Sequence, residues 1–209
     1  MKKYVLYTIG IVIMALGVAI SSFHGLGASP FDSLNFNVAS IANLEIATTM
    51  LIFNAIFVLL FFIIHRNKDI YLSVICLFAF SFLADAFINI LSYIFIINDL
   101  WFRIIQFILG FTLTAIGIAF VEESTLSRTP FECFVAVMDK IVFPKLDYAK
   151  SRIITEVLVT GVGAVLGLIF MGGLENVGIG TAIYMFCTGP VVQLFIKKFS
   201  RIIKEDRLK

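Results

Sequence analysis

Charged residues are scarce in this chain of 209 residues. Asp, Glu, Lys and Arg make up 14% of it, while hydrophobic residues make up 60%. An ordinary soluble domain has about 25% charged and about 45–50% apolar residues. A water-soluble fold of this length cannot bury so much apolar surface. The composition therefore argues against a soluble enzyme or a nucleic-acid-binding protein and indicates an integral membrane protein.

Cysteine is equally scarce. The three cysteines, Cys76, Cys133 and Cys187, are scattered and form no C-x-x-C pair. They predict neither a disulfide framework nor a zinc site. The sequence also shows no nucleophile–base pair and no phosphate-binding signature. We therefore expect no enzyme activity, no metal and no cofactor.

Long apolar runs are abundant. A transmembrane helix needs about 20 mostly apolar residues to cross about 30 Å of hydrocarbon. The stretches that qualify are Tyr4–Phe23, Ile46–Ile64, Ile70–Ile97, Trp101–Val121, Ile153–Met171 and Gly178–Ile196. The third is long, and the segment from Asp85 to Asn89 interrupts it, so it is either a tilted span or a span with a local break. The sequence predicts an all-α membrane protein with six transmembrane helices.

The basic residues predict the orientation, because Lys and Arg near span ends accumulate on the cytoplasmic side. With the N-terminus inside, fifteen of the sixteen fall in cytoplasmic segments. These are Lys2, Lys3, Arg66, Lys68, Arg128, Lys140, Lys145, Lys150, Arg152, Lys197, Lys198, Arg201, Lys204, Arg207 and Lys209. The other face holds only Arg103. Both termini are therefore predicted to be cytoplasmic.

The two halves of the chain resemble each other at an offset of 100 residues. Seven identities fall within positions 10–31, and they pair Gly10, Ala15, Gly17, Ala19, Leu26, Pro30 and Phe31 with Gly110, Ala115, Gly117, Ala119, Leu126, Pro130 and Phe131. Since each half contains three spans, the second half must enter the membrane from the opposite side. The prediction is two inverted 3+3 repeats, 1–97 and 101–196, followed by a basic cytoplasmic tail at 197–209. Inverted repeats are frequent in secondary transporters.

Each repeat contains a connector with proline after its first span. Ser29-Pro30-Phe31-Asp32 and Thr129-Pro130-Phe131-Glu132 each predict the cap and first turn of a short helix, with an acid at its positive end. The short helices, about Phe31–Ile41 and Phe131–Phe143, are either re-entrant or interfacial. We expect the connectors to act as gates, through Gly25, Gly27, Pro30, Asp32, Pro130 and Glu132.

Small residues mark faces for close helix packing. They are Ala15, Gly17 and Ala19 in the first span and Ala115, Gly117 and Ala119 in the fourth. Small residues let two helix backbones approach closely. Either these two helices pair at the centre of the protein or the face contacts a partner subunit.

Few polar groups lie within the spans, and such groups usually face the bundle interior. The candidates for binding a substrate or ion are Asp85, Asn89, Glu156, Asn54 and Gln193. Asn89 follows Asp85 by one helical turn. The alternative for Glu156 is a surface pair with Arg152, four residues earlier, and for Asp85 a structural hydrogen bond to a neighbouring helix.

The motifs resemble those of the YczE/YyaS/YitT family of bacterial membrane proteins. The first connector, residues 25–34, matches the G-L-G-x-x-P-[WF]-D-x-L signature of that family. The second half adds Arg152-x-x-x-Glu156, Gly178-x-Gly180-Thr181 and Gly189-Pro190-x-x-Gln193-Leu194 in the order that the family shows. The second connector keeps the proline and the acid but lacks the glycines usual there. The resemblance implies a bacterial inner-membrane protein.

The leading hypothesis is a small-solute transporter or permease, with a polar cavity between the two repeats. An acid in this cavity would bind a cation or carry a proton. One alternative is a substrate-capturing subunit of a multi-component importer, docked through its Ala-x-x-x-Ala face to an energising partner. A second is a scaffold or regulator that transports nothing. The expected partners are the lipid bilayer, a small solute or ion, and either a second copy of the chain or the energising subunit.

Overall fold

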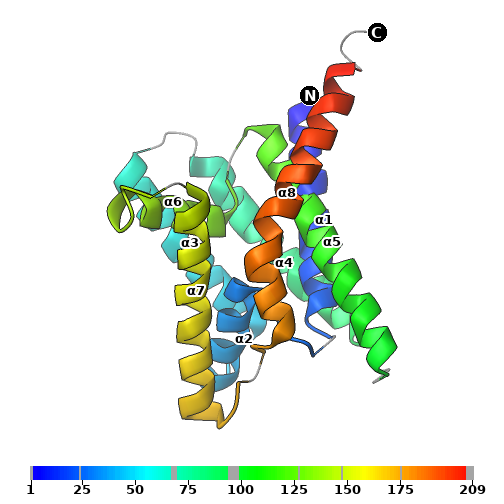
Figure 1. Cartoon of the computed structure of the whole chain (residues 1–209), viewed down its shortest axis with the longest axis vertical. Coiled ribbons are helices and arrows are strands. Elements are labelled where there is room, and N and C mark those ends of the chain that lie inside the picture. The colour runs from blue at the N-terminus through cyan, green and yellow to red at the C-terminus, as the bar shows by residue number, and fades with distance from the viewer. Residues whose placement is uncertain are drawn as a thin grey trace.

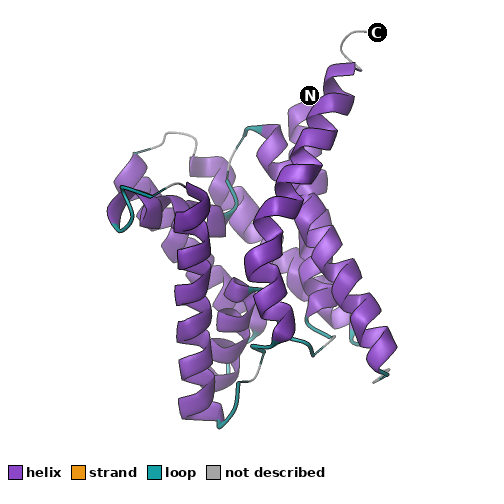
Figure 2. Ribbon diagram, viewed as in Figure 1, coloured by secondary structure: helices purple, strands orange, loops and turns teal. Residues whose placement is uncertain are grey.

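The computed structural model describes residues 2–23, 25–66, 70–93, 99–126, 128–146, 148–174 and 176–205. Within these ranges the chain is helical and contains no strand, so the all-α prediction is confirmed (Figures 1 and 2). The helices are α1 (Lys2–Ser21), α2 (Pro30–Ala42), α3 (Ile46–His65), α4 (Ile70–Leu91), α5 (Leu100–Ser124), α6 (Pro130–Ile141), α7 (Tyr148–Leu166), the π-helical turn η1 (Gly167–Met171) and α8 (Ile179–Glu205).

Long apolar helices form each of the predicted spans. Among the described residues, six helices are long and apolar enough to cross a membrane: α1, α3, α4, α5, α7 with η1, and α8. The protein is thus a multi-pass membrane protein. Helix α4 continues without a break past Asp85 and Asn89, so the interrupted form of the third span is wrong. Residues 94–97 of that predicted span lie outside the described residues.

Helices α1 and α5 cross at the centre, and their backbones touch at glycines. A Cβ atom on Gly10 would lie 2.9 Å from the Gly117 carbonyl oxygen, and one on Gly17 would lie 2.9 Å from the Gly110 carbonyl oxygen. Because the residue numbers rise on one helix as they fall on the other, the two helices are antiparallel. Only residues without a Cβ permit this approach, so central pairing explains Gly17 and Gly117.

The alanines of the same helices are fully buried and face other neighbours. Ala15 belongs to a core cluster that includes residues of α4, whereas Ala115 and Ala119 pack against Val192 of α8. The remaining helices form matching pairs: α4 packs on α1 and α8 on α5, while α2 packs on α7 and α6 on α3. All of these helices thus pack into one bundle.

The long helix α8 extends beyond the predicted sixth span. It runs without interruption from Ile179 to Glu205 and includes Pro190, so the predicted basic tail begins as a continuation of this helix. Residues 206–209 of that tail lie outside the described residues. The start of α1 and the end of α8 lie at the same end of the bundle (Figure 1). We call this the terminal end and the other one the distal end.

Candidate functional site: a charged cavity where two short helices meet

The short helices α2 and α6 begin in the same way. In α2 the Ser29 hydroxyl accepts a hydrogen bond from the Asp32 N–H at 3.3 Å, and in α6 the Thr129 hydroxyl accepts one from the Glu132 N–H at 3.3 Å. Pro30 and Pro130 occupy the first turns. Proline fits there because the first N–H groups of a helix have no partner within the helix. The predicted caps, first turns and acidic residues are therefore present in both short helices.

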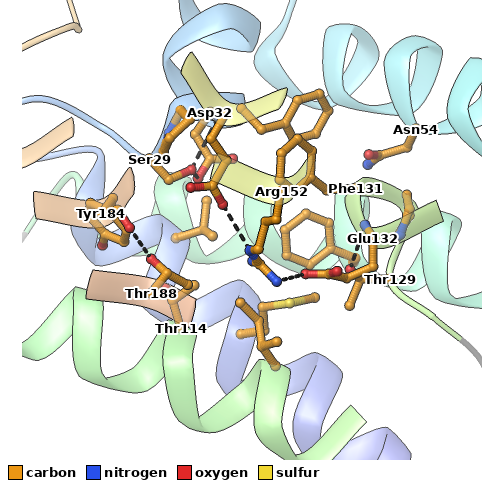
Figure 3. Close-up of a pocket in the computed structure, with 18 residues that line it drawn as sticks. Ser29, Asp32, Asn54, Thr114, Thr129, Phe131, Glu132, Arg152, Tyr184 and Thr188 are labelled. Atoms are coloured by element: carbon orange, nitrogen blue, oxygen red, sulfur yellow. Dashed lines mark hydrogen bonds and ion pairs between the residues drawn. The ribbon is translucent and has the colours of Figure 1, made fainter. Parts of the chain in front are cut away.

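The two helix starts face each other inside the bundle. The rings of Phe31 and Phe131 stack with their centroids 5.4 Å apart. A cavity of about 80 Å³ lies beside them, lined by residues from each of the helices α1 to α8 (Figure 3). The residues with polar side chains that line it are Ser29, Asp32, Asn54, Thr114, Thr129, Glu132, Arg152, Glu156, Tyr184 and Thr188. A buried water needs about 10–15 Å³, so the cavity has room for several waters or a small solute.

Arg152 of α7 lies in this cavity, between the start of α2 and the start of α6 (Figure 3). Its Nε donates to Glu156 Oε1 at 3.1 Å, and its Nη1 forms a close ion pair with Glu132 Oε1. The side chains of Glu132 and Glu156 are 5% and 4% exposed, and that of Arg152 is 14% exposed. Glu156 does pair with Arg152, but as part of a buried group that also includes the acid of α6.

Asp32 lies in a different environment from Glu132. The Ser29 hydroxyl donates a hydrogen bond to Asp32 Oδ2 at 2.5 Å. Burial raises the pKa of Asp32 from 3.8 to about 6, and the hydrogen bond from Ser29 opposes this rise. The carboxyl group of Asp32 therefore keeps its proton to a higher pH than an exposed aspartate does.

Asn54 and Glu156 are two of the cavity-lining residues that carry a buried polar atom with no hydrogen-bond partner among the described residues. Asn54 is 1% exposed and Glu156 is 3% exposed. Among the described residues, neither Asn54 Nδ2 nor Glu156 Oε2 has a hydrogen-bond partner. Leaving a buried polar atom unpaired costs about 1–3 kcal/mol, more when it is charged. These atoms are therefore poised to contact a molecule that enters the cavity.

Distal to the cavity, backbone contacts join the first connector to the start of α8. The Gly180 N–H donates to the Leu26 carbonyl at 2.7 Å, and the Ala28 N–H donates to the Asn176 carbonyl at 2.8 Å. Gly27 has a φ of +105°, and a Cβ there would lie 2.5 Å from the Gly178 nitrogen. Position 27 therefore requires glycine for two reasons: a Cβ would collide with Gly178, and other residues rarely adopt this positive φ. We call residues 25–28 with 176–181 the distal seal.

Arg103 of α5 adds one more contact to this region. The Arg103 guanidinium donates to the Gly25 carbonyl at 2.8 Å, and Gly25 has a φ of +60°. The single basic residue that sequence analysis assigned to the opposite face thus holds the first connector in place.

A groove adjoins the cavity on the other side, between α5, α7 and α8. It shares Glu132 and Arg152 with the cavity and also holds Glu122, Arg128 and Gln193. Among the described residues, no group of three or more His, Cys, Asp or Glu side chains is placed to hold a metal ion. The charged groups of the cavity therefore continue into a groove that holds further charged side chains, Glu122 and Arg128.

The structure brings some of the predicted residues together and leaves others apart. Glu156, Asn54, Pro30, Asp32, Pro130 and Glu132 line the cavity. Gly25 and Gly27 belong to the distal seal, and Gln193 is exposed in the groove. Asp85 and Asn89 lie outside the cavity, where Asn89 Nδ2 donates to Asp85 Oδ2 at 3.1 Å.

Sequence reasoning missed Arg152, the aromatic wall and the two capping hydroxyls as parts of one site. The signal for Arg152 was its position one helical turn before Glu156, which places both side chains on one helix face. The signal for Phe31 and Phe131 was their equivalence in the repeat. Nothing in the sequence indicated that Tyr184 and Thr188 of α8 would complete the lining.

The fold and the cavity define the class of this protein: a multi-pass helical membrane protein with charged groups buried between its helices. Residues 1–197 match the family of unknown function DUF6198, and the chain belongs to that family. It is 27% identical over 195 residues to the uncharacterized protein YyaS of Bacillus subtilis (strain 168), across 93% of this chain and 92% of that protein. The resemblance to YyaS-like proteins is thereby confirmed. No solved structure is significantly similar to the chain.

Proposed function

We propose that this protein is a small-solute transporter whose binding site is the cavity between α2 and α6. The observation that carries the proposal is the buried group of Asp32, Glu132, Arg152 and Glu156 in a membrane protein. Ionisable groups inside a membrane are costly, and they are typical of substrate and ion pathways. Glu156 Oε2 and Asn54 Nδ2, which have no hydrogen-bond partner among the described residues, support the proposal because both belong to residues that line the cavity.

The proposed architecture is a pair of inverted repeats, residues 1–97 and 101–196. The antiparallel crossing of α1 and α5 supports opposite orientations of the two halves. The matching helix pairs support it further, since α2 packs on α7 as α6 packs on α3. In transporters of this construction the substrate site lies near the midplane, where the repeats meet. Residues of both halves line the cavity, as this proposal requires.

We propose that both termini face the cytoplasm of a bacterial inner membrane, because nearly all Lys and Arg fall on that side. The terminal end then faces the cytoplasm and the distal seal faces outward. The groove with Glu122 and Gln193 joins the cavity to the terminal half of α8. In this proposal the groove is the inner route and the distal seal blocks the outer one, so transport requires the distal seal to open.

The proposal favours a self-sufficient carrier over a subunit of a larger importer. The importer hypothesis relied on an exposed Ala-x-x-x-Ala face on α1. Ala15 and Ala19 are both fully buried within the protein. That face is thus covered by the chain's own helices, and an energising partner would need another surface.

The test begins with a thermal-unfolding screen of the purified protein against libraries of metabolites and ions. Binding to the folded state raises stability by an amount set by concentration and affinity. Each stabilising compound is then loaded into proteoliposomes and assayed for exchange across the membrane. We expect at least one compound to stabilise the protein and to exchange, and both effects to be lost in Glu156→Gln but kept in Glu45→Gln, an exposed control. Stabilisation without exchange would reject transport, and no stabilisation at all would favour the scaffold alternative.

A further inference from the structure

We propose that the ligand of the cavity is a small organic monocation, an alkylammonium or guanidinium compound. This inference rests on the proposed function and adds the substrate class. It follows from three properties of the cavity: its charge, its aromatic wall and the way in which it already holds one guanidinium group.

The charge of the cavity favours a cation. Three carboxyl groups, those of Asp32, Glu132 and Glu156, face one guanidinium group, that of Arg152. The cavity therefore carries a net charge of −2 when all four groups are ionised. The pairs to Arg152 use Oε1 of each glutamate, and Glu156 Oε2 has no partner among the described residues. A positively charged donor is the group that this carboxylate oxygen still lacks.

The two helix starts are poor sites for an anion. A helix N-terminus binds anions through its free N–H groups. Here Pro30 and Pro130 have no N–H, and the N–H groups of Asp32 and Glu132 donate to the caps Ser29 and Thr129. The first turns thus present few free donors to the cavity, and an acidic side chain stands at each of them.

The aromatic wall favours an organic cation over an inorganic one. Phe31, Phe80, Phe131 and Tyr184 line the cavity. A hard cation such as Mg²⁺ or Ca²⁺ requires six or more oxygen ligands, whereas an ammonium group with carbon substituents binds well against aromatic faces. Rings next to carboxylates provide both contacts for such a group, one for the carbon atoms and one for the charge.

The Arg152 side chain shows how such a ligand would bind. Its guanidinium group lies between Glu132 and Glu156 and satisfies one oxygen of each. An external amine or guanidine meets the remaining acceptors, Glu156 Oε2 and Asp32, beside this resident cation. Asn54 Nδ2 then provides a donor to any carbonyl or hydroxyl group on the ligand.

The experiment measures thermal unfolding of the full-length purified protein at pH 7.5 with methylammonium chloride or tetramethylammonium chloride. Sodium chloride and sodium acetate at equal ionic strength are the comparison salts. We expect at least one ammonium salt to raise the unfolding temperature in a saturable manner and both sodium salts to have a smaller effect. An equal or larger effect of sodium acetate would overturn the inference, as would the absence of any difference among the four salts.

Two variants test the named contacts. Glu156→Gln should weaken binding of the stabilising ammonium ion by about a hundredfold, because it removes a buried charge. Phe131→Leu should weaken it by about tenfold, because it removes one aromatic face. The matched controls are Glu45→Gln and Phe82→Leu, both exposed positions, where affinity should stay unchanged. Wild-type affinity in both cavity variants would overturn the inference.

The outcome separates this inference from the proposed function. If an anion or a neutral compound from the wider screen stabilises the protein and exchanges in proteoliposomes, transport stands and the cation inference falls. If the ammonium ions bind in the cavity but do not cross the membrane, the ligand class stands and transport falls.

Discussion

The two short helices begin with the same pattern of cap, proline, phenylalanine and acid, yet their surroundings differ. In α2 the acid Asp32 is held by its own cap, Ser29, and residues 30–37 are all buried. In α6 the acid Glu132 pairs with Arg152 of another helix, and the far end of α6 is exposed at Lys140 and Ile141. One short helix therefore provides a carboxyl group that is free to bind a proton or ligand, and the other anchors the resident cation.

The connectors that lead into these helices also differ. The first approaches α2 through Gly25 and Gly27 in left-handed conformations and contacts the backbone of α8. The second leaves α5 at Thr125, which itself has a φ of +56°, and it has no such glycines. A repeated sequence can thus begin the same helix twice while only one copy forms a tight seal. The following predictions test this difference, from the largest effect to the smallest.

Removing the acid of α6 should destabilise the protein far more than removing the acid of α2. A buried hydrogen bond between charged groups contributes about 1.5–3 kcal/mol. Because Arg152 keeps its pair with Glu156 in Glu132→Gln, we expect that variant to lose about this much. We expect Asp32→Asn to change the free energy of unfolding by less than about 1 kcal/mol, because burial already disfavours the ionised Asp32. Equilibrium unfolding in detergent measures both, and similar losses would show that the two acids have equivalent roles.

Adding a methyl group in the distal seal should destabilise the protein, whereas adding one on an open helix face should not. Gly27→Ala introduces a Cβ 2.5 Å from the Gly178 nitrogen at a positive φ, whereas a Cβ on Gly161 of α7 meets nothing within 4 Å. We expect Gly27→Ala to cost more than about 1 kcal/mol, and Gly161→Ala to be neutral or slightly stabilising. Thermal unfolding of both variants checks this prediction. An unchanged unfolding temperature in Gly27→Ala would mean that the distal seal opens at no cost in stability.

The two caps should differ by a smaller amount. Loss of a capping hydroxyl costs about 1 kcal/mol. Thr129→Ala should show about this loss, while Ser29→Ala should lose more because the Ser29 hydroxyl also donates to Asp32 Oδ2. Paired unfolding measurements decide the order. A greater loss of stability in Thr129→Ala would contradict the view that the Ser29 hydroxyl holds Asp32 as well as capping α2.

Binding of a cation should depend on pH through Asp32. Its raised pKa of about 6 means that the carboxyl group is mostly neutral at pH 5 and mostly ionised at pH 7. Affinity for methylammonium should therefore rise by about tenfold over this range, and Asp32→Asn should flatten the profile. The other ionisable groups that line the cavity are Glu132, Arg152, Glu156 and Tyr184. Titration calorimetry at several pH values measures the profile, and an unchanged slope in Asp32→Asn would assign it to one of these groups.

The smallest effect is expected at Asp85, the acid that the sequence made most prominent. It pairs with Asn89 on α4, away from the cavity. Asp85→Asn should leave the affinity for the stabilising compound and the rate of exchange unchanged. A loss of exchange with normal binding would instead support the sequence-based prediction and place Asp85 on the transport pathway.

The local geometry of the site could be predicted from the sequence. Which of the polar residues line the cavity could not. The cap, proline and acid of each short helix are contiguous, so their geometry follows from four residues. Asp85 and Glu156 looked alike because each is an acid in an apolar run with a polar residue four positions away. Only the packing of α4 against α1 and of α7 against α2 assigns them to different places.

The sequence alone determined the membrane class, the approximate positions of the spans and the starts of both short helices, because these depend on hydrophobic length and on contacts within a few residues. Tertiary structure decided which acid receives Arg152, which connector seals the cavity and which aromatic rings line it. Those contacts join residues of different helices, some of them far apart in the chain, such as Leu26 with Gly180. They form only when the helices pack, and the central contact of that packing is the meeting of α1 and α5 at their glycines.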